Sequence, residues 1–198
     1  MCAQPAIRSA TRWSWSDYQA WPDDKRWELI AGEAFAMAPA PSIAHQSVTL
    51  RLAARLEQAL KGKSCRPFVA PVDVRLSDAD VVQPDVLVVC DPKKITTHYI
   101  DGAPDLVIEV LSPATATRDL REKKALYAKY GVREYIVVDP LEYYVTRFLL
   151  SEGRYGAGDV FGGDETLELV CLPTVEIALW EVFDLPAPGT APAAASPM

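Results

Sequence analysis

The sequence predicts an α/β domain in which β-strands and helices alternate. Dense aliphatic runs at 86–89 and 106–111 are typical of strands that are covered on both faces. Apolar residues recur at every fourth position within 43–60, which is the pattern of an amphipathic helix. A strand, a helix and a strand follow one another between 106 and 139. This succession predicts a right-handed crossover with its two strands parallel in one sheet.

The length and composition agree with one soluble globular domain. The chain has 198 residues, of which 49% are hydrophobic and 24% are charged. Residues 186–198 are rich in Pro, Ala and Ser and contain nothing large to bury, so we expect a disordered tail there. The single domain is therefore assigned to residues 1–185.

Several short elements are expected on the N-terminal side of the central strands. A serine-capped helix should end at Pro22. The segment WELIAGEAFAMAP, at 27–39, predicts two short strands joined by a turn at Ala31 and Gly32. The alternation of apolar and other residues from 68 to 76 predicts one half-buried strand.

The crossover helix is expected in the segment DLREKKALYAKYG, at 119–131, with its final glycine as the stop. Its apolar face should consist of Leu120, Leu126, Tyr127 and Tyr130. Beyond it, we expect strands at 134–139, 143–150 and 167–171 and a short helix near 177–183.

The charge distribution restricts how the protein can contact nucleic acid. A net charge of -7 excludes a protein whose whole surface binds a phosphate backbone. Locally, the segment 118–133 carries six basic residues against two acids. A contact with nucleic acid is therefore expected on this side of the molecule, whereas a solvated helix with ordinary ion pairs is the structural alternative.

The cysteines and the hydropathy point to a cytoplasmic protein. The four cysteines, Cys2, Cys65, Cys90 and Cys171, are far apart and form no CxxC motif, so we expect buried free thiols rather than a zinc or redox site. The N-terminus lacks the apolar core of a signal peptide, and no stretch approaches the roughly 18 apolar residues of a membrane span.

Two acidic residues beside apolar strands are the first functional candidates. Asp85 precedes the aliphatic run of QPDVLVV, and Glu109 interrupts DLVIEV where an aliphatic residue is expected. A buried carboxylate is costly unless it is paired, hydrogen-bonded or bound to a metal. Two carboxylates suit Mg²⁺, which keeps several waters and can activate one of them. With a nearby lysine, this is a minimal set of groups for phosphodiester hydrolysis.

Four segments together carry a resemblance to a known family: WELIAGE, QPDVLVV, PDLVIEVLSP and DLREKKALYAKYGVREYIVVDP. Between Trp27 and Phe183 the chain resembles the PD-(D/E)XK, or restriction-endonuclease-like, nuclease superfamily, and more closely a bacterial family of putative restriction endonucleases. The resemblance implies a central mixed β-sheet flanked by helices and cleavage of DNA that depends on Mg²⁺ or Mn²⁺. It also implies a homodimer, and metal ligation by Asp85, Glu109 and Val110.

The superfamily lysine is absent from its usual place two residues after the second acid, where this chain has Leu111. Lys123 on the following helix is the best substitute, as a helical lysine also occurs in the family that the chain resembles. Asp119 lies four residues before it and so shares its helix face. Lys124 points about 100° away around the helix and is the weaker candidate.

The predicted catalytic residues are therefore Asp85, Glu109, Lys123, Asp119 and Glu33. Glu33 is included as a further acid from the N-terminal hairpin, and His45 or Gln46 is expected to line the same cleft. Each of the lesser candidates has a structural alternative: Asp119 as a residue favoured at a helix N-terminus, Glu28 and Glu33 as solvated hairpin residues, and His45 as a polar helix start.

Two other functions compete with the endonuclease. Because Leu111 replaces the usual lysine, the chain is alternatively a catalytically inactive module of the nuclease fold that binds nucleic acid or protein. The third hypothesis is metal-dependent hydrolysis of a small phosphate ester.

Overall fold

The computed structural model describes residues 12–22, 25–37 and 40–190. Cys2 and residues 191–198 of the predicted tail lie outside these ranges. The helices are α1 (Trp15–Gln19), α2 (Ile43–Leu60), η1 (Pro92–Lys94), α3 (Ala116–Arg118), η2 (Asp119–Lys123), α4 (Lys124–Tyr130) and α5 (Leu179–Phe183). The strands are β1 (Trp27–Ile30), β2 (Glu33–Ala36), β3 (Arg66–Val69), β4 (Asp73–Arg75), β5 (Val81–Val82), β6 (Val86–Val89), β7 (Tyr99–Asp101), β8 (Leu106–Val110), β9 (Glu134–Asp139), β10 (Tyr144–Ser151), β11 (Arg154–Tyr155), β12 (Asp159–Gly162), β13 (Thr166–Glu168) and β14 (Glu176–Ala178).

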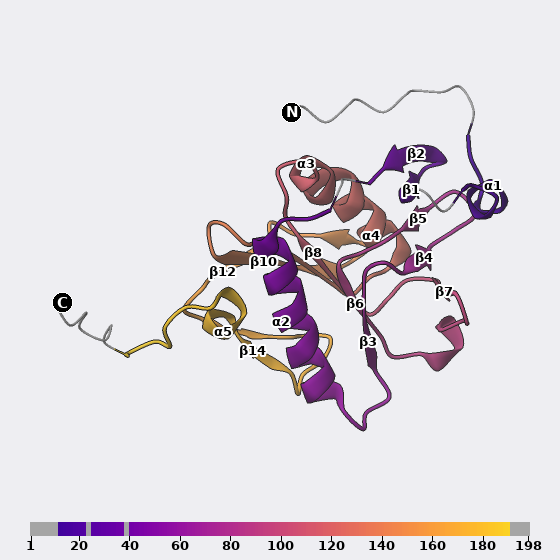
Figure 1. Ribbon diagram of the computed structural model, residues 1–198. Coiled ribbons are helices and arrows are strands. Elements are labelled where there is room, and N and C mark those ends of the chain that lie inside the picture. Colours follow the sequence, from indigo (N-terminus) through magenta and orange to yellow (C-terminus); the bar gives the residue numbers. More distant parts are fainter. Residues whose placement is uncertain (1–11, 23–24, 38–39, 191–198) are drawn as a thin grey trace.

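A seven-stranded mixed sheet forms the centre of the protein (Figure 1). Its order is β11-β10-β9-β8-β6-β3, and β12 also pairs with β10. The pair β8 and β9 is parallel, as predicted for the crossover, and the other pairs in this sheet are antiparallel. A second sheet, β2-β1-β5-β4-β7, contains the N-terminal hairpin, and β13 and β14 form a separate two-stranded sheet.

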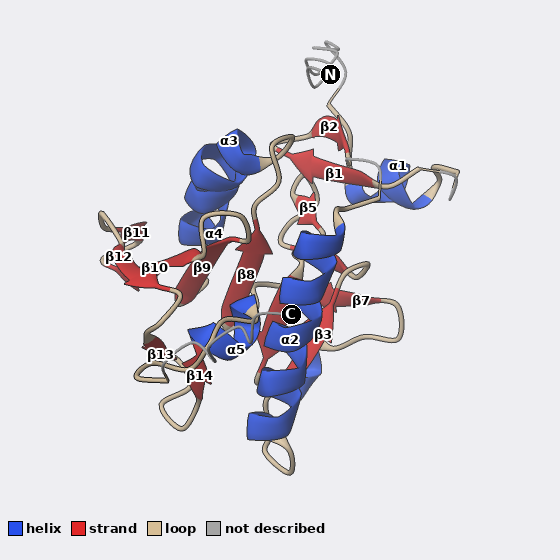
Figure 2. Cartoon of the chain, turned by 60° about the vertical axis from the view of Figure 1, so that its left-hand side comes forward, coloured by secondary structure: helices blue, strands red, loops and turns tan. Residues whose placement is uncertain are grey.

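Helices cover both faces of the central sheet (Figure 2). On one face, α2 buries a stripe of Val48, Leu52, Leu56 and Leu60 against alternate residues of β6, β8 and β9. On the other face, Leu126 and Tyr127 of α4 pack against the intervening residues of the same strands. The dense aliphatic character of these strands therefore follows from cover on both faces.

The crossover helix differs from the predicted one in its inward face. Leu120, predicted in the core, is 43% exposed, whereas Asp119 beside it is buried. The inward positions of η2 are occupied by Asp119 and Lys123, so the neighbouring Leu120 turns toward solvent. The predicted stop is confirmed, because Gly131 adopts a left-handed conformation with φ 82°.

The strand predicted at 68–76 is in fact two strands in different sheets. β3 belongs to the central sheet and β4 to the second sheet. The chain leaves the first sheet at the cis peptide bond between Ala70 and Pro71. Proline has no N–H to donate to a sheet ladder, so it interrupts the strand even though the period-two pattern continues through it.

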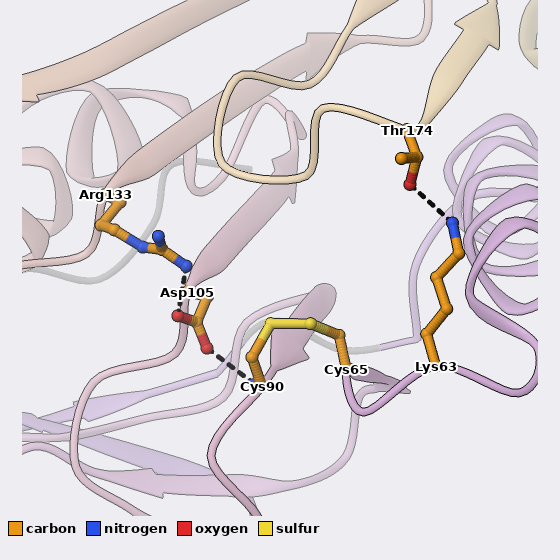
Figure 3. Close-up of a disulfide and its surroundings, with 6 residues drawn as sticks. All are labelled: Lys63, Cys65, Cys90, Asp105, Arg133 and Thr174. Carbon is orange, nitrogen blue, oxygen red and sulfur yellow. Dashed lines mark hydrogen bonds and ion pairs between the residues drawn. A yellow bond between two sulfur atoms is a disulfide. The ribbon is translucent and has the colours of Figure 1, made fainter.

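The cysteines were predicted to be free thiols, and for two of them this is wrong. Cys65 and Cys90 form a disulfide (Figure 3). The antiparallel pairing of Arg66 with Val89, continued by one residue, brings the two cysteines opposite each other, although 25 positions separate them in sequence. Cys171 is a free, half-buried thiol. Beside the disulfide, the carboxylate of Asp105 accepts hydrogen bonds from the Cys90 N–H (2.7 Å) and from Arg133 (2.6 Å).

Asp80 links the N-terminal hairpin to the crossover helix through hydrogen bonds. Its buried carboxylate accepts hydrogen bonds from the N–H of Ala31 (2.6 Å), from Lys129 (3.1 Å) and from the hydroxyl of Tyr130. Burial raises the pKa of Asp80, but the hydrogen bonds from Tyr130, Ala31 and Lys129 outweigh burial and leave this pKa below its usual value. The ionised carboxylate is therefore the form that holds the hairpin in place.

We expect Asp80→Ala to lower the free energy of unfolding by about 3 kcal/mol at pH 7, because it leaves several donors without their charged acceptor. Since the pKa of Asp80 is lower in the folded state, the wild-type advantage is present above pH ~4 and is lost as the pH falls through the folded pKa. Urea denaturation at pH 7 and pH 3 measures both effects. Asp78→Ala, at an exposed position two residues away, is the control. An equal loss in the two variants would contradict this role.

Candidate active site

Asp85 and Glu109 lie side by side at the ends of neighbouring strands. In the antiparallel pair of β6 and β8, Val86 is opposite Ile108, so the next step of the same register places Asp85 opposite Glu109. The Oδ2 atom of Asp85 accepts a hydrogen bond of 2.8 Å from the N–H of Val110. The side chain of Asp85 is 21% exposed, whereas Glu109 is buried. The pair thus consists of one acid that solvent reaches and one that it does not.

Lys123 is the centre of a buried cluster of charges. Its Nζ lies 2.9 Å from Oε1 of Glu109, 2.8 Å from Oε1 of Glu28 and 3.6 Å from Oδ1 of Asp119. Each of the four residues is at most 4% exposed. We call Glu28, Glu109, Asp119 and Lys123 the acidic cluster. The structure therefore brings three of the predicted site residues together, and Asp85 adjoins them.

A π-helical turn presents Asp119 and Lys123 on the same side of the crossover. The two residues are the first and last of η2, and both side chains are buried. The wider π-turn still returns to nearly the same direction after four residues, so the predicted shared face is retained. Such turns occur often at functional sites, because they re-aim side chains within a helix.

Glu28 is a member of the cluster that the sequence interpretation treated as a solvated residue. It lies inside the strand sequence WELI, flanked by apolar residues, and is 2% exposed. The signal that singled out Glu109, an acid within an apolar strand, is therefore also present at Glu28.

Glu33 is the predicted acid that the structure does not bring to the cluster. It is the first residue of β2, is exposed, and pairs with Ile30 across the hairpin. The turn at Ala31 and Gly32 reverses the chain, so the acid of β1, rather than that of β2, reaches Lys123. Glu28 therefore occupies the place in the cluster that was predicted for Glu33.

Tyrosine hydroxyls complete the buried hydrogen bonding. The Tyr127 hydroxyl donates to Oε1 of Glu109 at 2.7 Å, and the Tyr135 hydroxyl donates to the backbone carbonyl of Asp119 at 3.0 Å. Burial, with the Glu109 charge in second place, raises the pKa of Tyr127 well above its usual value. Both tyrosines lie in the apolar core on the α4 side of the sheet, and Tyr127 belongs to the apolar helix face that the sequence predicted.

Burial and neighbouring charges together raise the pKa values of Glu109, Asp119 and Lys123. Burial raises the pKa of Glu109 well above its usual value; Lys123 opposes this rise, and the nearby carboxylates add to it. The pKa of Asp119 is raised for the same first reason, burial. Burial lowers the pKa of Lys123, but Glu109 and Glu28 outweigh it and hold this pKa well above the usual value. Lys123 therefore keeps its charge. Its single ammonium group is shared by three carboxylates.

His45 extends the site on the other side of Asp85. It lies in the first turn of α2, where Ser42 caps the helix by accepting the His45 N–H at 3.2 Å. Its Nε2 lies 3.2 Å from Oδ2 of Asp85. Burial lowers the pKa of His45, but Asp85, with a smaller contribution from the Val110 carbonyl, raises it overall. Gln46, the alternative at this helix start, is exposed.

The donor atoms of the site fit a hard divalent cation. Asp85, Glu109 and Asp119 offer carboxylate oxygens, and Val110 offers its backbone carbonyl, since its apolar side chain is buried in the core. The Oδ1 atom of Asp119 is buried and has no hydrogen bond from the described residues; its ion-pair contact with Nζ of Lys123 is 3.6 Å, so it can still accept a donor or a cation ligand bond. Oxygen ligands of this kind are those that Mg²⁺ prefers.

A preformed metal group is nevertheless absent among residues 12–22, 25–37 and 40–190: no three His, Cys, Asp or Glu side chains there are arranged to hold an ion. Lys123 lies between the carboxylates and neutralises part of their charge. Leu111, at the usual position of the superfamily lysine, packs against the apolar core instead. The cation at this site is therefore supplied by the helix.

The basic segment 118–133 has fewer free positive charges for binding nucleic acid than its sequence predicts. Lys123 is buried, Arg118 lies 3.8 Å from Glu28, and the charges of Lys129 and Arg133 are paired with Asp80 and Asp105. Tertiary contacts thus neutralise most of the local positive charge that the sequence predicts. In the described part of the chain, no helix has the length and apolar character to cross a membrane.

Comparisons with known proteins agree with this architecture. The model of the Uma2 family, described as putative restriction endonuclease, matches residues 15–180. The uncharacterized protein slr1290 of Synechocystis sp. is 29% identical over 126 residues, which are 62% of this chain and 66% of that protein. The crystal structure of a putative nuclease of DUF820 from Anabaena variabilis matches with a TM-score of 0.72 and 18% identity, over 86% of this chain and 97% of that one. The chain accordingly has a restriction-endonuclease-like fold and belongs to the Uma2 family of putative restriction endonucleases.

Proposed function

We propose that this protein is a divalent-metal-dependent endonuclease that hydrolyses phosphodiester bonds of DNA. The observation that carries the proposal is the acidic cluster: three buried carboxylates surround one ammonium group, directly beside the partly exposed Asp85. Asp85, Glu109 and the carbonyl of Val110 are the proposed metal ligands. Membership of the Uma2 family supports nuclease chemistry at this site.

The cluster is costly as a purely structural feature. Burying ions costs several kcal/mol each, and a well-packed apolar replacement is often more stable than a buried ion pair. Here the carboxylates outnumber the ammonium three to one, and in the described part of the chain a further cation, Arg118, contacts Glu28 at 3.8 Å. Strongly shifted pKa values that arise from burial and from specific charge partners are typical of functional sites. A site that binds a cation explains why this surplus of carboxyl groups is retained.

The residues of the site have different roles in the proposed reaction. When bound, Mg²⁺ or Mn²⁺ lowers the pKa of a ligated water and neutralises charge that develops on the phosphate. Lys123 keeps its proton and positions phosphate or water by charge, as the lysine of a nuclease site must. Tyr127 donates to Glu109 and so fixes the orientation of its carboxylate, while His45 does the same for Asp85.

Removal of metal is the direct test. Purified protein should cleave supercoiled plasmid and linear DNA in Mg²⁺ or Mn²⁺, and excess EDTA should lower the rate by about 10³-fold or more, because metal catalysis contributes several kcal/mol to transition-state stabilisation. Initial rates on gels measure the effect, and readdition of Mn²⁺ is the control for reversibility. Equal rates with and without EDTA would rule out the proposed mechanism.

A specific observation also favours a second function, a nuclease-fold module that binds nucleic acid without cleaving it. The amine of Lys123 already contacts two of the carboxylates within 2.9 Å, so these carboxylates have a cationic partner without a metal. Calorimetric titration with Mn²⁺ distinguishes the two. Saturable binding that Asp85→Asn weakens supports the enzyme, whereas absence of binding, with DNA affinity retained, supports the module.

A further inference from the structure

A cavity of about 460 Å³ lies beside the acidic cluster. Its aromatic lining comes from α1 and the segments around it: Trp15, Tyr18, Trp21, Trp27 and Tyr99. Figures 1 and 2 both show α1 next to β1, the strand that carries Glu28. The volume lies within the range of small-ligand pockets, which begins near roughly 300 Å³. Nothing in the proposed chemistry of the acidic cluster uses this cavity.

The aromatic side chains form a connected group of rings. Trp21 lies 5.6 Å from both Tyr18 and Trp27 between ring centroids, and Tyr18 stacks on Trp15 with an interplanar angle of 17°. Trp21 and Trp27 are only half-buried, so they keep surface that a ligand can cover. Each base of a nucleic acid presents a flat π-face, and aromatic side chains are the usual platforms for unstacked bases.

Polar groups in the same cavity are ordered and include an acceptor. Oδ1 of Asp73 accepts hydrogen bonds from the Tyr18 hydroxyl (2.6 Å) and from Nε2 of Gln83 (2.8 Å). Oε1 of Gln83 in turn accepts from Nε of Arg26 at 2.7 Å. No hydrogen bond from the described residues reaches Oδ2 of Asp73. This oxygen favours a ligand edge that carries N–H donors, as the bases do, and it repels phosphate from the interior.

The rim of the cavity is positively charged, in contrast to the Asp73 carboxylate inside it. Lys25 and Arg26 line it and are exposed. An anionic group therefore fits at the mouth, whereas an uncharged, planar, hydrogen-bonding group fits inside. A nucleotide with its base in the cavity and its phosphate at the rim has both properties. A cationic ligand held by the aromatic rings would instead meet the positive rim.

The cavity is joined to the acidic cluster by Gln83. Its side chain lines the cavity, while its backbone N–H donates to Oε1 of Glu28 at 3.1 Å. Trp27 directly precedes Glu28, and Gln83 lies two residues before Asp85. We propose that this cavity takes a nucleobase unstacked from a single-stranded or distorted nucleic acid, so that the adjoining backbone runs toward the acidic cluster. The inference specifies the substrate class and rests on the proposed function.

Binding without cleavage tests the inference. In EDTA, a labelled single-stranded oligonucleotide should bind more tightly than its perfect duplex, and mononucleotides should quench the tryptophan fluorescence. Trp21→Ala should weaken single-strand binding about tenfold, the size expected for loss of one stacking platform. Trp180→Ala, which removes a half-buried tryptophan of α5 outside the cavity, should bind as the wild type does. Circular dichroism verifies that both variants fold.

A second variant tests the rim without touching the aromatic rings. Lys25→Ala changes an exposed side chain and should reduce the preference for a nucleotide over the corresponding nucleoside, with nucleoside affinity unchanged. Wild-type affinity for single strands in Trp21→Ala, or a duplex preference in the wild type, would overturn the inference. So would an unchanged nucleotide preference in Lys25→Ala.

The two proposals fail in different ways. Single-strand binding that depends on Trp21, combined with absence of metal-dependent cleavage, supports the cavity and refutes the nuclease. Metal-dependent cleavage combined with wild-type single-strand binding by Trp21→Ala refutes the cavity alone.

Discussion

Lys123→Met is expected to abolish DNA cleavage and to lower the free energy of unfolding by about 3–5 kcal/mol at pH 7. Methionine has a similar length and no charge, so the change removes the ammonium group while filling much of the same volume. Glu28, Glu109 and Asp119 then remain buried at one place without the cation that contacts them. Breaking a buried ion pair from one side is costly because the remaining charges stay desolvated.

The stability of this variant should depend on pH in a defined direction. Burial already raises the pKa of Glu109 and of Asp119, and the ammonium that opposes this rise is lost. Carboxyl groups whose pKa is higher in the folded state bind more protons when folded, so their contribution is favourable below the unfolded pKa of about 4. It is lost as the pH rises through the folded pKa. The deficit relative to the wild type should therefore be smaller at pH 5 than at pH 8.

Lys124→Met is the matched control, because it makes the same chemical change at the next residue. Lys124 lies over the ring of Phe148, with Nζ 3.7 Å from the ring centroid, and away from the acidic cluster. Urea denaturation at the two pH values and initial cleavage rates provide the measurements. If the two variants lose stability and activity equally, the proposed role of Lys123 in the acidic cluster and in cleavage is refuted.

Asp85→Asn and Glu109→Gln are each expected to lower metal-dependent cleavage by about 10³-fold, equivalent to about 4 kcal/mol of transition-state stabilisation. Both changes keep the shape of the side chain and remove the negative charge that a metal ligand must supply. The amide oxygen introduced at position 85 can still accept the Val110 N–H, and the one introduced at position 109 can still accept from Tyr127. The fold should therefore persist, with a melting temperature within a few degrees of the wild type.

Glu134→Gln provides a control with the same chemistry at a comparable depth. Glu134 is fully buried in β9, the strand beside β8, and its Oε2 accepts the Cys171 N–H at 2.8 Å. It lies opposite Leu106, at the far end of the pair from Glu109. Its variant should keep the cleavage rate of the wild type. Activity that survives in both Asp85→Asn and Glu109→Gln would refute the assignment of the site.

Local patterns account for the elements that the sequence predicted well. The helix at 43–60 and the strand at 86–89 have the predicted bounds, because the spacing of their apolar residues depends only on which face is buried. The turn at Ala31 and Gly32 also lies where it was predicted, since both residues adopt positive φ. The mixed character of the central sheet was implied by family resemblance and is confirmed by its strand pairing.

Contacts between distant segments account for the features that the sequence did not predict. The disulfide depends on the register of β3 and β6, and the entry of Glu28 into the site depends on how the second sheet packs against η2. The basic segment lost most of its free charge to partners elsewhere in the chain. None of these partners is recognisable from spacing, because each is chosen by three-dimensional proximity.

The sequence by itself determined the long helix, the two aliphatic strands, the parallel crossover and the two acids at the strand ends, since these follow from periodicity and from the cost of burying charge. Only the tertiary structure decided which cations and acids meet. Lys123 reaches Glu28 and Glu109 because the π-turn of η2 aims it at two strands from different sheets. Side-chain charges act over a few ångströms, so the composition of such a site is settled by packing rather than by position along the chain.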